Sequence, residues 1–302
     1  MLCAAIDIGS NTTRLLVAEP VGGQLKKAME QRAYTRIGRA LDADRAIPAE
    51  KAGEVAEVVA TQVRLARELG AETIRAVATA AIREAPNGER VAGEIGEASG
   101  VVVDILSEEE EGRLSFIGAT KTLGHPVAGT IGVVDVGGGS TELILGTVAG
   151  GVSEVRSWPV GSGALADDLI ASDPPSAAEI RKVRDRIESI FEGVEVERPA
   201  QAVAVGGSAT SLRRLVGAVL EYETLERGVR VLSGEPATEV ARRFELDPVR
   251  VRILPTGVLL LEKLSELLGQ PLQIGKGGLR EGIVLDLLNG SSNGSPPARV
   301  AA

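Results

Sequence analysis

The 302-residue sequence predicts an α/β fold made of two related domains. Three observations lead to this prediction. Segments typical of strands alternate with segments typical of helices along the whole chain. The length suits two domains, at roughly 100–200 residues each. A strand–turn–strand motif occurs once in each half, which is typical of a gene duplication.

The first half is bounded by clear start and stop signals. Pro48 stands at the favoured first position of a helix and Gly70 closes it. Ser107 and Glu110 have the form of a capping box, so a helix begins there. Gly22-Gly23 turns the chain into a third strand. The remaining apolar segments predict strands over residues 2–8, 14–19, 73–78 and 101–106.

A polar, Gly/Pro-containing patch over residues 122–130 separates the second half from the first. A second capping box, Ser176 to Glu179, opens a helix that ends near Gly193. Strands are predicted over residues 131–136, 141–147, 152–158, 201–205 and 272–274, and further helices over residues 236–244, 256–268 and 279–288. We therefore expect domains at 1–121 and 122–288, with the last helix able to pack back on the first domain, and a disordered, low-complexity tail at 289–302.

The internal repeat is the most informative of these patterns. Asp7–Val17 superposes without a gap on Asp135–Leu145, and Gly9 meets Gly137 while Thr13 meets Thr141. Each copy reads as a strand, an acidic residue, a tight polar turn and a second strand. Two duplicated sheets, each offering such a turn to a shared cleft, would explain both copies.

Composition excludes several kinds of chemistry. One cysteine, Cys3, excludes a disulfide framework, and one histidine, His125, excludes sites with several histidine ligands. His125 lies in a Gly/Pro loop and is expected to be exposed. The net charge of −9 and the scarcity of aromatic residues argue against nucleic-acid binding. No stretch resembles a membrane span or a signal peptide, so we expect a cytoplasmic protein without membrane contact.

The second copy of the repeat has the residues of a phosphate site. Successive backbone amides at Gly137-Gly138-Gly139 form a concavity that an anion can enter, and the hydroxyls of Ser140 and Thr141 add donors. Asp135 and Glu142 flank the turn with carboxylates. Carboxylate oxygens suit Mg²⁺, which needs few protein ligands besides the oxygens of the substrate.

Three other segments allow both a structural and a functional interpretation. Glu108-Glu109-Glu110-Glu111 begins a helix, where acidic residues favour the helix dipole, but one of them facing a cleft could act as a general base. Arg83 follows a strand, where it suits either a phosphate or a surface salt bridge. Gly206-Gly207-Ser208 joins a strand to a helix, as an anion site or as an ordinary turn. Arg280-Glu281 favours structural ion pairing.

Seven motifs in order along the chain resemble those of the exopolyphosphatase/guanosine pentaphosphate phosphatase (Ppx/GppA) family, from Ala5 to about Leu288. They are Ile6-Asp7-Ile8-Gly9-Ser10-Asn11, Ala78-Thr79-Ala80-Ala81-Ile82-Arg83-Glu84-Ala85, Glu110-Glu111-Gly112-Arg113-Leu114, Asp135-Val136-Gly137-Gly138-Gly139-Ser140-Thr141-Glu142, Pro159-Val160-Gly161-Ser162-Gly163, Gly206-Gly207-Ser208-Ala209-Thr210 and Gly278-Leu279-Arg280-Glu281-Gly282. That family shares the fold of sugar kinases, actin and heat-shock ATPases. The resemblance implies two duplicated actin-like (ribonuclease H-like) domains with an active cleft between them.

The resemblance also implies roles for single residues. Glu111 would activate the attacking water, with Glu110 as the alternative. Mg²⁺ or Mn²⁺ would be held by Asp135 and Glu142, with Asp7 as a further candidate. The terminal phosphates would be bound by Ser10, Asn11, Arg83, Gly137, Gly138, Gly139, Ser140 and Thr141, and by the amides of Gly207 and Ser208 at the helix start.

The implied activity is release of orthophosphate from inorganic polyphosphate by a homodimeric enzyme. Alternatives are removal of the 5′ γ-phosphate of guanosine pentaphosphate, a catalytically weak sensor of nucleotide or polyphosphate and, less favoured, an ATP-dependent kinase. Two departures from the family pattern bear on the substrate preference: this chain has Ala80 where the family often has a small hydroxyl residue, and Glu108 where it often has a glycine. Longer relatives carry additional domains, so we expect shorter chains or nucleotides to be handled relatively well here.

Overall fold

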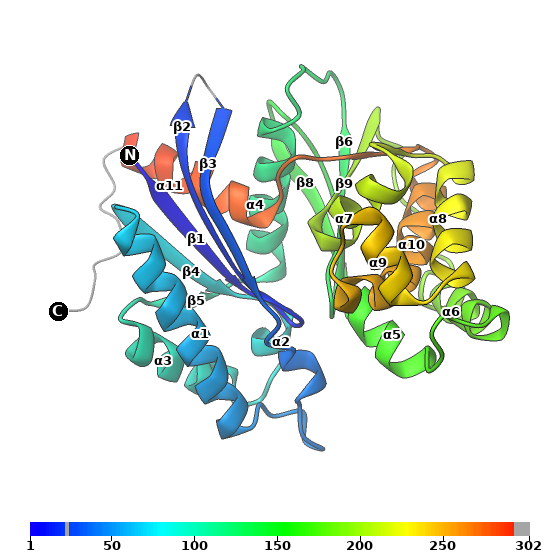
Figure 1. Ribbon diagram of the computed structural model, residues 1–302. Coiled ribbons are helices and arrows are strands. Elements are labelled where there is room, and N and C mark those ends of the chain that lie inside the picture. Colours follow the sequence, from blue (N-terminus) through cyan, green and yellow to red (C-terminus); the bar gives the residue numbers. More distant parts are fainter. Residues whose placement is uncertain (22–23, 293–302) are drawn as a thin grey trace. The chain divides into compact units, whose positions relative to one another are not determined.

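A computed structural model describes residues 1–21 and 24–292 (Figure 1). The chain forms two compact units. Unit 1 consists of residues 1–124 together with the segment that begins at Gly277, and unit 2 consists of residues 125–276. The first unit is therefore discontinuous in sequence and the second is continuous.

Unit 1 contains a five-stranded sheet in the order β3-β2-β1-β4-β5. The β1–β2 and β2–β3 pairs are antiparallel, while β1–β4 and β4–β5 are parallel. Its elements are β1 (Cys3–Ile8), β2 (Thr13–Val21), β3 (Gln24–Ala33), η1 (Ile37–Arg39), α1 (Ala49–Glu68), β4 (Thr73–Ala78), α2 (Ala80–Arg83), α3 (Gly88–Ser99), β5 (Val103–Ile105), α4 (Glu108–Lys121) and α11 (Leu279–Ser292).

Both faces of this sheet are buried, and alternate side chains of β1 point into the core on each face. Ala4, Ile6 and Ile8 pack with residues of α1 and α3 on one face. Cys3 and Ala5 pack with residues of α4 and α11 on the other. Figure 1 shows the sheet with these helices around it. The last helix of the chain thus completes the core of the first unit.

Unit 2 contains a six-stranded sheet in the order β10-β11-β9-β6-β7-β8. The apolar helix α10 packs against helices α5 to α9 and against β6, so it forms the centre of the core. The elements are β6 (Ile131–Val136), β7 (Thr141–Thr147), β8 (Gly151–Trp158), α5 (Ser162–Leu169), α6 (Ala177–Ile190), β9 (Gln201–Val205), α7 (Gly206–Val216), β10 (Val219–Leu220), α8 (Tyr222–Gly234), α9 (Ala237–Phe244), α10 (Pro248–Leu268) and β11 (Leu272–Ile274).

The two sheets share their register as well as their strand order. Asp7 and Asp135 lie 128 residues apart (135 minus 7). The same offset relates the parallel pairs, because Asp7 lies opposite Val77 and Asp135 opposite Val205. It also relates the two bulges, which fall between Val17/Ala18 and between Leu145/Gly146. The predicted α/β class and the internal duplication are confirmed.

The structure corrects several predicted boundaries. Helix α10 begins at Pro248, whereas we predicted a start at residue 256, and Pro255 lies inside the helix. Helix α11 continues to Ser292, so residues 289–292 are helical and do not belong to a disordered tail. The rest of that tail and the turn at Gly22-Gly23 lie outside the described residues. Helices α3, α5 and α8 were not predicted.

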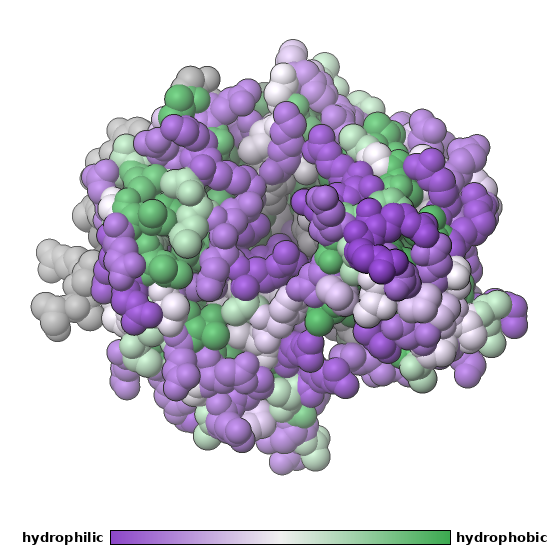
Figure 2. Space-filling view, in the orientation of Figure 1, coloured by the Kyte–Doolittle hydropathy of each residue, from purple (hydrophilic) through white to green (hydrophobic). Residues whose placement is uncertain are grey.

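The visible surface in Figure 2 is mostly hydrophilic, with small, separate hydrophobic areas. The large hydrophobic residues exposed in the described part of the chain are Met1, Val21, Leu69, Val102, Val148, Val219 and Tyr222. His125 is exposed, as predicted. None of the described helices is both long and apolar enough to cross a bilayer.

Candidate functional site

The glycine-rich turn of unit 2 presents two backbone amides in the same direction. At the start of α5, the N–H of Ser162 donates to Gly137 O (2.9 Å) and the N–H of Gly163 donates to Gly138 O (3.0 Å). In a trans peptide the following N–H points opposite to the carbonyl, so the amides of Gly138 and Gly139 point away from α5. Within the described residues these two amides have no hydrogen-bond acceptor. They form an arrangement suited to an anion.

The close approach of α5 explains the Gly161-Ser162-Gly163 motif, whose role the sequence analysis missed. A Cβ on Gly161 would lie 2.4 Å from the carbonyl carbon of Gly138, so only glycine fits there. Ser162 Oγ also donates to Gly137 O (3.0 Å), and the hydroxyl of Ser208 lies 3.3 Å from that Oγ. Motif spacing alone gave no signal for this support, because the two segments are separated along the chain.

Two hydroxyl groups in the predicted phosphate-binding segments support the glycine-rich turn. Thr141 is fully buried and its Oγ1 donates to Val160 O at 2.6 Å. Ser208 is fully buried and its hydroxyl bonds to Ser162. Both hydroxyls therefore brace the turn, and the phosphate contacts predicted for Thr141 and for the Ser208 amide stay predictions. Ser140 is also buried, and its carbonyl accepts from the N–H of Gly137 (3.0 Å) within the turn.

The two carboxylates beside this turn lie on one face of the sheet. Asp135 and Glu142 are directly opposite each other on antiparallel strands β6 and β7, so their side chains are neighbours. Glu142 is 3% exposed and accepts a long hydrogen bond from Ser157 (3.5 Å). A Cβ on Gly206, which has a φ of +81°, would lie 2.2 Å from Asp135 Oδ1, so the carboxylate packs against the start of α7.

This carboxylate pair fits a hard divalent cation. Two like charges directly opposite in a sheet destabilise it unless a cation compensates them. One or two protein carboxylates suffice for Mg²⁺, which retains water or takes substrate oxygens. No group of three or more His, Cys, Asp or Glu residues is arranged to hold a metal in the part of the chain that the structure describes. Any cation at Asp135 and Glu142 would therefore depend on substrate and water for its other ligands.

The equivalent position in unit 1 has the opposite charge. Asp7 lies opposite Arg14 on strands β1 and β2, where unit 2 has Glu142 opposite Asp135. Burial raises the pKa of the Asp7 carboxyl, and the charges of Arg14 and Arg280 act in the other direction. Because Asp7 already has cationic neighbours, it is the weaker of the candidate metal ligands.

The turn that follows Asp7 repeats the hydrogen bond of its counterpart in unit 2. The N–H of Gly9 donates to Thr12 O (3.1 Å), as Gly137 does to Ser140. Ser10 and Asn11, predicted to bind phosphate, are half-buried in this turn. Their carbonyls accept from the N–H groups of Gly38 (2.9 Å) and Arg36 (3.0 Å), so a second segment fixes the turn from outside.

The structure brings together the predicted base and the predicted phosphate-binding arginine. Arg83 Nη1 donates to Glu111 Oε2 at 2.7 Å and to Leu106 O at 3.1 Å. Glu111 is 8% exposed and is the one buried residue among the four glutamates that begin α4. Arg83 ends the short helix α2, which follows strand β4, and Glu111 lies in the first turn of α4, which follows strand β5. Arg83 therefore forms a salt bridge that is mostly buried, with the candidate base as its partner, and its phosphate-binding role stays a prediction.

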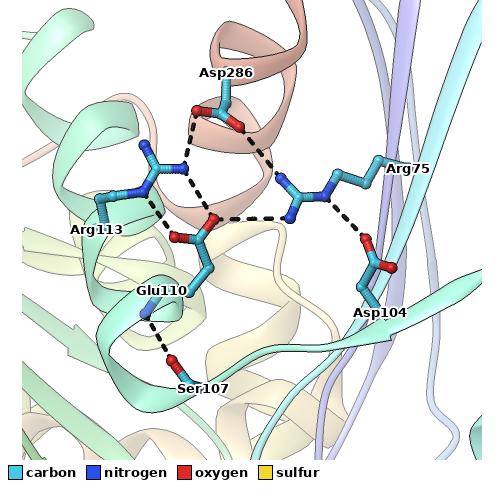
Figure 3. Close-up of polar contacts among 6 residues, drawn as sticks. All are labelled: Arg75, Asp104, Ser107, Glu110, Arg113 and Asp286. Atoms are coloured by element: carbon cyan, nitrogen blue, oxygen red, sulfur yellow. Dashed lines mark hydrogen bonds and ion pairs between the residues drawn. The ribbon is translucent and has the colours of Figure 1, made fainter. Parts of the chain in front are cut away.

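Glu110 belongs to a different cluster, shown in Figure 3. Its carboxylate accepts two hydrogen bonds from Arg113 (2.7 and 2.9 Å), and Arg75 lies 3.7 Å away. Asp286 of α11 contacts both arginines. Hydrogen bonding by Arg113 lowers the pKa of the Glu110 carboxyl. In the predicted capping box, the hydroxyl of Ser107 accepts a hydrogen bond from the N–H of Glu110 (3.2 Å). The Glu110 carboxylate bonds to Arg113 and not to the N–H of Ser107.

A close glycine contact joins α4 to α11. A Cβ on Gly118 would lie 1.9 Å from Gly278 O, and one on Gly282 would lie 1.8 Å from Leu114 O. Ion pairs then hold the start of α11 to strand β3: Arg280 contacts Glu30 (3.3 Å) and Glu281 contacts Lys27 (3.2 Å). The structural ion pairing predicted for Arg280-Glu281 is thus observed, with partners on another element.

The predicted site residues divide between the units. Asp7, Ser10, Asn11, Arg83 and Glu111 are in unit 1. Asp135, Gly137 to Glu142, Gly207 and Ser208 are in unit 2. Helix α7 begins at Gly206 without a side-chain cap, as an anion-binding helix start requires. The predicted cleft and the functional roles stay predictions.

Comparisons with known proteins agree with the motifs. The sequence matches the profile of the Ppx/GppA phosphatase family over residues 16–290. Exopolyphosphatase 1 of Mycobacterium leprae is 28% identical, over 98% of this chain and 92% of that protein. Exopolyphosphatase 2 of Mycobacterium tuberculosis is 29% identical, over 94% and 98%. A crystal structure of the Aquifex aeolicus member of the Ppx/GppA family matches with a TM-score of 0.81 at 28% identity, over 98% and 99%.

Proposed function

Because this chain belongs to the Ppx/GppA phosphatase family, we propose that it is an exopolyphosphatase that releases orthophosphate from the end of inorganic polyphosphate. The observation that carries the proposal is the pair of amides at Gly138 and Gly139, which have no acceptor among the described residues and lie in the turn between the strands that carry Asp135 and Glu142. Amides suit phosphate oxygens and carboxylates suit a cation that binds the same oxygens. The similarity to two mycobacterial exopolyphosphatases supports the choice of substrate.

In this proposal Glu111 accepts a proton from the attacking water. Arg83 holds the Glu111 carboxylate in one orientation and, with Leu106 O as its other acceptor, is itself fixed in place. The amides of Gly138 and Gly139 stabilise charge on the phosphoryl group that is transferred. Asp135 and Glu142 would hold Mg²⁺ or Mn²⁺, which supplies positive charge to the phosphate oxygens when bound. The bond between the terminal phosphorus and the bridging oxygen breaks, and the polyphosphate, shortened by one phosphate unit, leaves with that oxygen.

The neighbouring glutamates provide a matched test of this assignment. Glu111→Gln removes the candidate base, and Glu110→Gln removes an equal charge one residue away that is bound by Arg113. We expect orthophosphate release from polyphosphate with Mg²⁺ to fall by roughly 10²–10⁴-fold in Glu111→Gln. The loss in Glu110→Gln should be below about tenfold. Equal activities of the two variants would contradict the role of Glu111.

The same assay distinguishes the substrates. Tripolyphosphate, long-chain polyphosphate and guanosine pentaphosphate are compared at matched enzyme concentration, with turnover per active site as the measurement. Highest turnover on a polyphosphate supports the proposal, whereas faster hydrolysis of guanosine pentaphosphate would replace it. Tight binding of either substrate by calorimetry without turnover would indicate a sensor instead.

A further inference from the structure

Segment 35–38, which follows strand β3, is attached to the predicted phosphate turn of unit 1. The hydroxyls of Thr35 and Thr13 are hydrogen-bonded at 3.0 Å in the core. The amides of Arg36 and Gly38 donate to the carbonyls of Asn11 and Ser10, as described above. Ile37, between them, is 1% exposed. The backbone of Arg36 is therefore fixed directly beside Ser10 and Asn11.

Arg36 has a backbone conformation that is uncommon for its residue type. Its φ is 48° and its ψ is 44°, in the left-handed region that glycine and asparagine occupy most easily. Two other non-glycine residues among the described ones have positive φ. Glu245 ends helix α9, where this conformation is usual, and Arg45 is an exposed loop residue whose guanidinium lies 3.7 Å from Glu84.

The side chain of Arg36 differs from the other sheltered arginines. Arg36 is half-buried, yet within the described residues no hydrogen bond or ion pair engages its guanidinium. Each of the other described arginines that is buried or half-buried has an interaction partner: Arg14, Arg75, Arg83, Arg113, Arg156, Arg184, Arg250 and Arg280. The guanidinium nitrogens of Arg36 are not among the buried, unsatisfied atoms of the described residues, so its donors are accessible and available to a bound anion.

We propose that Arg36 is a further substrate-binding residue, whose guanidinium binds phosphate oxygens of a polyphosphate held at the Ser10–Asn11 turn. The inference rests on the proposed function for the identity of the substrate. A guanidinium presents a planar set of donors that matches phosphate oxygens, and the fixed backbone of Arg36 reduces the entropy lost on binding. Strained residues are retained mainly where they contribute to a site, which agrees with the left-handed conformation.

The test replaces the side chain and preserves the backbone. Arg36→Asn removes the guanidinium and accepts the left-handed conformation. Arg36→Gly accepts it without strain and guards against a folding defect in the first variant. Arg45→Asn is the matched control, because Arg45 has the same residue type and a φ of 59° but is exposed and lies beside Glu84. Thermal melts check that all three variants are folded.

Two measurements separate this proposal from the proposed function. The KM for polyphosphate with Mg²⁺ should rise about 10- to 100-fold in both Arg36 variants, and remain within twofold of the unmodified protein in Arg45→Asn. Calorimetric binding of tripolyphosphate, which needs no turnover, should weaken by the same factor. If the unmodified protein binds tripolyphosphate but does not hydrolyse polyphosphate, the proposed function fails and the binding comparison still decides the role of Arg36. Binding by a folded Arg36 variant within twofold of the unmodified protein, or no binding by the unmodified protein, would overturn the proposal.

Discussion

Replacing Gly282 by alanine tests whether the glycine contact between α4 and α11 sets the stability of unit 1. The new Cβ would lie 1.8 Å from Leu114 O and 2.6 Å from the carbonyl carbon of Leu114. Ordinary contacts begin near 3.4 Å, so the two helices have to separate by more than 1 Å. The clash is with backbone, and no side-chain rotamer can relieve it.

The expected cost follows from the core between these helices. Separation loosens the packing of Leu114 with Leu279, Ile283 and Val284, which are all buried. Overpacking of a well-packed core costs about 1–3 kcal/mol, and a backbone clash belongs at the upper end of that range. At about 3 kcal/mol, the melting temperature should fall by roughly 6–12 °C. Activity should fall too, because the first turn of α4 contains Glu111.

Gly93→Ala is the matched control for this experiment. Gly93 also lies within a helix of unit 1, but a Cβ there would meet nothing within 4 Å. Alanine favours a helix over glycine by up to about 1 kcal/mol, so this variant should melt at the same temperature or slightly higher. Calorimetry of both variants provides the comparison. A Gly282→Ala protein that melts within about 1 °C of the unmodified protein would refute the reasoning.

Three other predictions concern the carboxylates. Gly206→Ala should lower both stability and orthophosphate release, because the new Cβ lies 2.2 Å from Asp135 Oδ1 at a φ of +81°; thermal melts and the release assay measure the two effects. Asp135→Asn and Glu142→Gln should each raise the Mg²⁺ concentration needed for half-maximal activity by tenfold or more, and an unchanged Mg²⁺ titration would argue against the cation site. Arg113 lowers the pKa of Glu110 below its usual 4.5, so the stability that Glu110 contributes is present above pH 4.5 and is lost as the pH falls through the lowered pKa. Denaturant unfolding should therefore show Glu110→Gln to be less stable than the unmodified protein at pH 7, with the difference shrinking below pH 4.5.

The sequence was most informative where local patterns and chemistry coincide. The strand–turn–strand repeat predicted the duplicated sheets, because alternation and turn glycines are local properties that the fold preserves in both copies. The predicted helix over residues 256–268 was shorter than α10, which continues past Pro255 although proline disfavours a helix interior. Asp247 followed by Pro248 was a start signal that we overlooked.

The motifs indicated the segments of the candidate site but not what each side chain contacts. The hydroxyls of Thr141 and Ser208 bond to other segments, and motif spacing does not encode such tertiary contacts. The pairing of Arg83 with Glu111 joins residues 28 positions apart and was likewise invisible in the motifs. Arg36 was overlooked because neither its left-handed backbone nor its lack of a partner can be seen in a sequence.

The discontinuity of unit 1 has a consequence for how the protein is made. Residues 125–276 leave the ribosome as one continuous stretch, so unit 2 has its whole core available while unit 1 still lacks α11. Until α11 is synthesised, the cluster that α4 forms with one face of the sheet lacks Leu279, Ile283 and Val284. Order of synthesis and order of completion are therefore reversed. Helix α4, whose first turn contains Glu111, receives its packing partner α11 only after all of unit 2 has been synthesised.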